Sequence, residues 1–121
     1  MFGFFKKKKE DKVIGDAMEI IGKCFILAGY PSDDAMQVAM VALDSVIKEK
    51  AEKLPKPWVL AVWSMHKLAS RIESEESKDT GDLNLVNELK TQILNSMDNA
   101  KKDATDVDLM VLKSIERYAK K

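Results

Sequence analysis

The sequence contains one cysteine, Cys24, and one histidine, His66, in 121 residues. A single cysteine excludes an internal disulfide, and one residue of each type is too few for a zinc site of the usual kind within one chain. Cys24 has apolar neighbours at Ile20, Ile21 and Leu27. We therefore expect a reduced thiol that packs like a small apolar side chain, as is typical of cytoplasmic proteins.

Glycine and proline are also scarce, with five and three residues respectively. The chain has no glycine-rich phosphate loop and no G-x-S-x-G motif. The stretch that begins at Asp79 superficially resembles a calcium loop, but Gly81 and Leu83 occupy positions that need side-chain oxygens. His66 follows Trp63 by three residues, so the Glu-x-x-His pattern of helical metal sites is missing too. These absences predict a protein that is not an enzyme and needs no cofactor or metal.

The chain lacks a long hydrophobic run and an excess of charge of one sign. No apolar stretch approaches the roughly 20 residues that span a bilayer. Glu10 and Asp11 follow the N-terminal lysines where a signal peptide would continue with apolar residues. The formal net charge is zero, which argues against a general nucleic-acid-binding protein. We expect a cytoplasmic protein.

Apolar residues recur at three- and four-residue spacing through most of the chain, which is the pattern of amphipathic helices. The sequence predicts an all-α, single-domain bundle of four to five helices over residues 11–121, preceded by a basic and aromatic tail over residues 1–10. The expected helices cover about 11–28, 33–53, 57–76, 83–101 and a last segment from Thr105. Residues 73–82 are polar and acidic and are predicted to form a loop.

Several helix ends have recognisable signals. Gly29 is placed to end the first helix in the left-handed conformation, and Pro57 suits a first helical turn. Ser32 and Asp82 are predicted N-caps for the second and fourth helices. Thr105, with Asp108 three residues later, predicts a capping box for the last helix.

The second predicted helix is apolar on nearly all sides from Ala35 to Leu43, which predicts that it is the central helix of the bundle. Trp58 and Trp63 point in different directions on the third helix, so we expect one in the core and the other partly exposed or at a subunit contact. Methionines alternate with Val, Leu and Ile at core spacing. We interpret them as core residues in preference to a partner-binding stripe: Met18, Met36, Met40, Met65, Met97 and Met110.

The N-terminus sorts aromatic and basic residues into two adjacent blocks. Residues 1–12 carry five lysines against two acids, a net charge of +3, whereas residues 73–106 carry nine acids against four bases, a net of −5. Such a segment suits an anionic membrane surface or an acidic partner. In the alternative interpretation, its phenylalanines extend the first helix or fold onto the bundle while the lysines are solvated. The candidate contact residues are Phe2, Phe4, Phe5, Lys6, Lys7, Lys8 and Lys9.

His66 is the one residue that could support an enzyme-linked function. The segment from His66 to Arg71 resembles the phosphorylatable-histidine helix of two-component signalling proteins, a resemblance that covers one turn and implies phosphotransfer at His66. The chain departs from the sensor-kinase pattern because Lys67 replaces the acid after the histidine and the following proline is missing. It departs from phosphotransfer domains because Ala69 stands where they have lysine. From the residues themselves we expect His66 to pack beside Trp63 and hydrogen-bond locally.

Together these observations predict a non-enzymatic helical interaction or adaptor protein with an unidentified protein partner, an anionic membrane surface as a further contact, and self-association as a further expectation. One alternative is a signalling or phosphotransfer domain that uses His66. A second is a weak nucleic-acid-binding module that uses the two basic ends of the chain.

Overall fold

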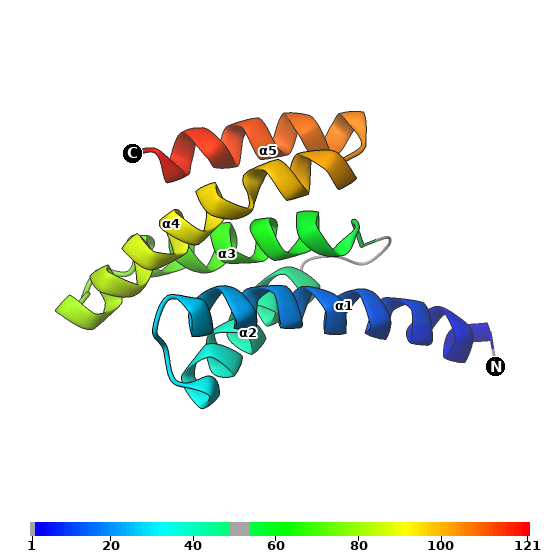
Figure 1. Cartoon of the computed structure of the whole chain (residues 1–121), viewed down its shortest axis with the longest axis horizontal. Helices are drawn as coiled ribbons and strands as arrows, with labels where there is room; N and C mark the ends of the chain where they lie inside the picture. The colour runs from blue at the N-terminus through cyan, green and yellow to red at the C-terminus, as the bar shows by residue number, and fades with distance from the viewer. Residues whose placement is uncertain (1, 49–53) are drawn as a thin grey trace.

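A computed structural model describes the backbone of residues 2–48 and 54–121, and the side chains of residues 12–48 and 54–121. The protein is all-α, as the sequence predicts, and consists of five helices over the described residues (Figure 1). The helices are α1 (Phe2–Leu27), α2 (Ser32–Ile47), α3 (Pro57–Ser74), α4 (Thr80–Asp103) and α5 (Asp106–Ala119).

The central helix is α3, which contacts α1, α2, α4 and α5. Figure 1 shows α4 and α5 on one side of α3 and α1 on the other, with α2 behind α1. Nine of the 18 residues of α3 are buried, against five of the 16 residues of α2. The prediction that the second helix is central is therefore wrong.

The reason lies in the size of the side chains along α2. Its buried stripe begins with Ala35, Ala39 and Ala42, whose small side chains allow close packing against its neighbours. The larger Met36 and Met40 lie one turn apart at the edge of this stripe and are 39% and 57% exposed. An apolar composition made α2 look central, but its only extensive contacts among the described helices are with α1 and α3.

The connections from α1 to α2 and from α2 to α3 follow the signals predicted from the sequence, with one exception at Ser32. Gly29 has φ 103°, the left-handed conformation predicted for it. The N-cap of α2 is Pro31, and Ser32 is the first residue of the helix. No side chain caps this helix end with a hydrogen bond. The Ser32 prediction is wrong because the chain enters the helix one residue earlier. Pro57 begins α3 as predicted, since its missing N–H would have no partner there.

Two capping boxes begin α4 and α5. Asp79, not Asp82, caps α4: its carboxylate accepts a hydrogen bond from the Asp82 backbone N–H at 2.7 Å, and Asp82 accepts one in return from the Asp79 N–H. The reciprocal pair moves the start of α4 to Thr80, so the loop is shorter than the predicted 73–82. Thr105 and Asp108 form the predicted box at α5.

Helix α1 begins at Phe2, nine residues before the predicted start at residue 11. Its N-terminal turns extend past the ends of the other helices (Figure 1). The side chains of the predicted contact residues Phe2 to Lys9 lie outside the described side chains. Within the described part, Ala17, Ile21 and Phe25 of α1 are fully buried at the bundle core.

Candidate functional site

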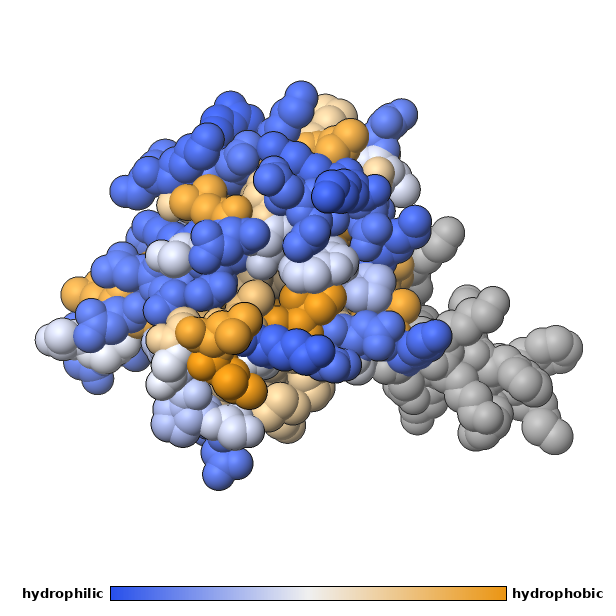
Figure 2. Space-filling view, viewed as in Figure 1, coloured by the Kyte–Doolittle hydropathy of each residue, from blue (hydrophilic) through white to orange (hydrophobic). Residues whose placement is uncertain are grey.

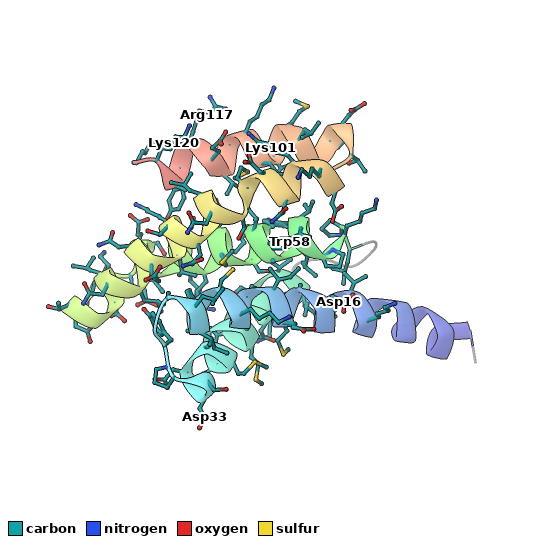
Figure 3. The ribbon with its side chains drawn as sticks, viewed as in Figure 1. Asp16, Asp33, Trp58, Lys101, Arg117 and Lys120 are labelled. Atoms are coloured by element: carbon teal, nitrogen blue, oxygen red, sulfur yellow. The ribbon has the colours of Figure 1, made fainter. Side chains whose placement is uncertain are left out.

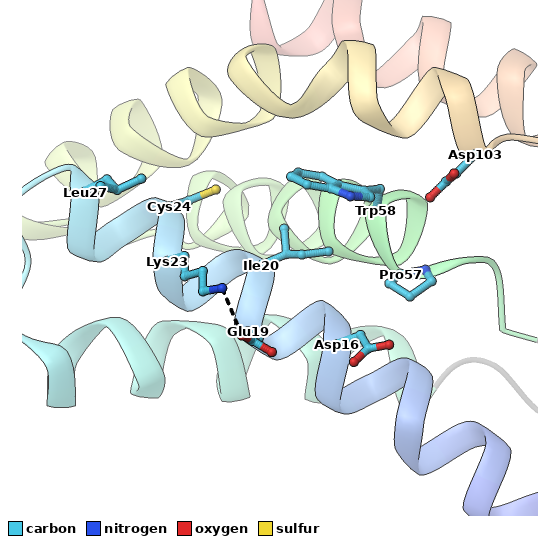
Figure 4. Close-up of a pocket in the computed structure, with 9 residues that line it drawn as sticks. All are labelled: Asp16, Glu19, Ile20, Lys23, Cys24, Leu27, Pro57, Trp58 and Asp103. Carbon is cyan, nitrogen blue, oxygen red and sulfur yellow. Dashed lines mark ion pairs between the residues drawn. The ribbon is translucent and has the colours of Figure 1, made fainter.

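An open groove runs between α1 and α4 over the N-terminal end of α3. Its larger section has a volume of about 540 Å³ and its smaller section about 330 Å³. The two sections share Cys24, Leu27 and Trp58, so they form one continuous feature, which we name the α1–α4 groove. Figure 4 shows the larger section, with Trp58 between the side chains of α1 and Asp103 of α4. The groove exists because α1 and α4 each pack on α3 and make few contacts with each other.

The apolar part of the groove comes from one stripe of α1 and from Trp58. Ile20, Cys24 and Leu27 follow the i, i+4, i+7 spacing of a single helix face. This face lies beside the buried stripe of α1, so α1 has apolar residues on two adjoining faces. Leu27 is 88% exposed, the highest value among the large apolar side chains described. Figure 2 shows the result as a band of apolar surface along α1, bordered by hydrophilic side chains.

The rim of the larger section of the groove is acidic. Asp16 and Glu19 of α1 and Asp103 of α4 line it, together with Lys23. Lys23 forms an ion pair with Glu19 at 2.9 Å, and both side chains are well exposed, so the pair contributes little to stability. Asp16 lies near Trp58 on the same face of the molecule (Figure 3). The rim therefore attracts positive charge.

The wall formed by α4 carries neutral hydrogen-bonding groups: Gln92, Asn95, Ser96 and Asn99. The Cys24 Sγ lies 3.8 Å from the Ser96 Oγ. Burial raises the pKa of the Cys24 thiol, although the Ser96 hydrogen bond acts in the opposite direction. A thiol held in its protonated form is a poor nucleophile. The groove thus offers apolar contact, amide and hydroxyl groups and an acidic rim, a combination suited to binding.

His66 belongs to a separate cluster in which α3, α4 and α5 meet. Its Nε2 lies 3.5 Å from the Ser70 Oγ, and its ring meets Tyr118 edge to face at 4.8 Å between centroids. The Tyr118 hydroxyl donates a hydrogen bond to Glu73, and the Lys90 ammonium lies 3.5 Å from the same carboxylate and 5.0 Å from the Tyr118 ring centre.

These contacts give the cluster a definite electrostatic character. The hydrogen bond from Tyr118 lowers the pKa of Glu73, and burial followed by that carboxylate raises the pKa of Tyr118. Burial, and then the positive charge of Lys67, lowers the pKa of His66. The His66 Nδ1 is buried and makes no hydrogen bond within the described residues. The predicted local hydrogen bond is present, through Ser70, and a half-buried neutral imidazole with an inaccessible Nδ1 fits a packing role.

The prediction that all the methionines fill the core is only partly right. Met65 and Met97 are buried, but Met36, Met40 and Met110 are 39%, 57% and 73% exposed. Sequence reasoning also missed the α1–α4 groove. The one available signal was the second apolar stripe at Ile20, Cys24 and Leu27, which exceeds what a single helix–helix contact needs.

Comparisons with known proteins give no match: no protein family, no curated protein and no solved structure is similar to this chain. Among the described residues, no helix is both long and apolar enough to cross a bilayer. The described part of the chain also holds no group of three or more His, Cys, Asp or Glu side chains arranged to bind a metal ion.

Proposed function

We propose that the protein is a non-enzymatic interaction module that binds an amphipathic helix of a partner protein in the α1–α4 groove. The observation that carries the proposal is the exposure of Leu27, at 88%, beside Trp58 in a groove between two helices. Helix-in-groove recognition places the apolar stripe of one helix against such a surface. Exposed apolar side chains that gather in a groove are a feature of interaction sites.

The chemistry of the groove defines the partner further. The acidic side chains Asp16, Glu19 and Asp103 on the rim favour a helix whose apolar stripe is flanked by lysine or arginine. Trp58 is the natural anchor of the contact, because tryptophan residues in the centre of an interface often dominate its binding free energy. Glu19 is exposed and Asp16 and Asp103 are partly exposed, so the attraction that these charges provide should weaken as the salt concentration rises.

A fluorescence titration tests this proposal. The chain has two tryptophans, so a Trp63→Phe variant leaves Trp58 as the single reporter in the groove. The probe is an amphipathic helical peptide of about 18 residues built from Leu and Lys, and the control peptide replaces every Lys by Glu. We expect the Leu–Lys peptide to shift the Trp58 emission to shorter wavelength and the Leu–Glu peptide to leave it unchanged.

Two further variants locate the binding. Leu27→Gln should weaken binding about tenfold or more, because an apolar side chain that becomes buried on binding contributes roughly 1.5–3 kcal/mol. It should leave the free energy of unfolding nearly unchanged, since Leu27 is already exposed. Asp16→Lys should also weaken binding, whereas Glu76→Lys, the same charge reversal in the exposed loop before α4, should not. Equal affinity for both peptides, or unchanged affinity in Leu27→Gln, would contradict the proposal.

A further inference from the structure

A second surface, formed by α2 and α3, has a different chemistry from the α1–α4 groove. It is an open hollow with a volume of about 460 Å³. Every described residue that lines it carries a hydroxyl or a positive charge, and none of these residues is a carboxylate or an aromatic residue. We name it the basic hollow; it is lined by Ser45, Lys48, Lys67, Ser70, Arg71 and Ser74.

The hollow is created by helix periodicity. The four residues from α3 follow the i, i+3, i+4, i+7 spacing of one face, and Ser45 and Lys48 of α2 are three residues apart. This spacing usually places apolar residues at a helix contact, but here it gathers donors at the edge of the α2–α3 contact. Arg71 bridges the two helices, because its guanidinium donates to the Ser45 Oγ at 3.3 Å.

Two serine hydroxyls of the hollow, one on each helix, already donate their O–H to backbone carbonyls. The Ser45 hydroxyl donates to the Val41 carbonyl at 3.1 Å, and the Ser74 hydroxyl donates to the Arg71 carbonyl at 2.7 Å. Lys48 forms an ion pair with Asp44 at 3.1 Å, but both side chains are more than half exposed, so an anion in the hollow can compete for the ammonium.

Helix ends explain how the positive charges are tolerated together. Lys48 is the C-cap residue of α2, and Arg71 lies in the last turn of α3. The C-terminal end of a helix carries partial negative charge, which favours cations and opposes anions, so an anion in the hollow must be held by side-chain charge. The guanidinium of Arg71 has five N–H donors, of which the Ser45 contact uses one. Donors remain to bind an anion.

We propose that the basic hollow binds a small soluble anion that carries more than one phosphate group. Arg71 provides the fork-like pair of donors that matches phosphate oxygens, and Lys48 supplies a point charge beside it. The volume of the hollow lies in the range of small-molecule sites, about 300–1,000 Å³. With no aromatic side chain among the described lining residues to stack on a base, the hollow suits a diphosphate or a phosphorylated sugar better than a nucleotide.

Isothermal titration of the full chain with inorganic pyrophosphate at low salt tests the proposal. We expect Arg71→Gln to weaken binding about tenfold or more, because a hydrogen bond to a charged group is lost together with the charge. The chain has only one other arginine, Arg117, which is exposed on α5 (Figure 3), so Arg117→Gln is the matched control. It should bind pyrophosphate as the wild type does.

His66 gives an independent measurement, since it is the only histidine and its Nε2 lies 3.5 Å from the Ser70 Oγ that lines the hollow. Pyrophosphate should shift the His66 ring signals in the NMR spectrum of the wild type and of Arg117→Gln, and much less in Arg71→Gln. Equal binding by Arg71→Gln and wild type would overturn the proposal. So would equal affinity for chloride and pyrophosphate, no detectable binding at low salt, or binding only to vesicles that contain phosphorylated lipids.

Discussion

The central position of α3 leads to a quantitative prediction about two methionines. Met65 of α3 is fully buried, whereas Met40 of α2 is 57% exposed. Both lie in apolar stretches of sequence, and the sequence pattern alone assigns both to the core. Replacing each by alanine makes the same chemical change in two environments, so the difference in stability reports which helix is enclosed by the others.

The magnitude follows from the burial of each side chain. Met65→Ala removes a side chain with no access to solvent and leaves a cavity in the hydrophobic core, which costs about 2–5 kcal/mol of the free energy of unfolding. Met40 keeps less than half of its surface covered, and its removal leaves an open surface instead of a closed cavity. Burying a whole methionine is worth roughly 1.5–3 kcal/mol, so Met40→Ala should cost about 1 kcal/mol or less.

Urea unfolding followed by helical circular dichroism measures both values. A domain of this size has a slope of about 1–3 kcal/mol per molar urea, so a loss of about 3 kcal/mol lowers the midpoint by roughly 1–3 M. The slopes of the two variants should equal that of the wild type, which shows that only the native state has changed. If Met40→Ala costs as much as Met65→Ala, the assignment of α3 as the central helix is refuted.

Two further predictions concern the helix caps and His66. Thr105→Ala should lower the free energy of unfolding by about 1 kcal/mol, because the Thr105 hydroxyl accepts a hydrogen bond from the Asp108 backbone N–H. Ser32→Ala should lower it by less than about 0.5 kcal/mol, because Ser32 makes no capping hydrogen bond. Equal losses of stability in thermal unfolding would refute this assignment of the caps. The native pKa of His66 lies below its ordinary value of 6.5, so the unfolded state binds the proton more tightly and the free energy of unfolding should fall as the pH drops from 7 to 5. Because His66 is the only histidine, His66→Leu should reduce that fall. If the urea midpoints of His66→Leu and of the wild type depend on pH in the same way, burial does not lower the native pKa of His66.

The sequence by itself determined the helical class and most of the helix ends. Gly29, Pro57 and Thr105 act through their own backbone preferences and through partners within three or four residues, so their roles can be read without knowledge of the fold. Where a local prediction was wrong, as at Ser32 and Asp82, the N-cap position lies one to three residues earlier, at Pro31 and Asp79. In both cases the sequence still predicted the helix itself correctly.

Tertiary structure alone decided which apolar faces are covered. Leu27 and Phe25 are two residues apart and both apolar, yet one is 88% exposed and the other fully buried. The difference arises because α1 and α4 both pack on α3 without closing the space between them, which no local pattern specifies. In the same way, Ser45 and Arg71 are 26 residues apart in sequence and form one donor cluster only because α2 packs against α3. Burial and charge clustering depend on contacts between distant segments, so the groove and the hollow appear only in the folded bundle.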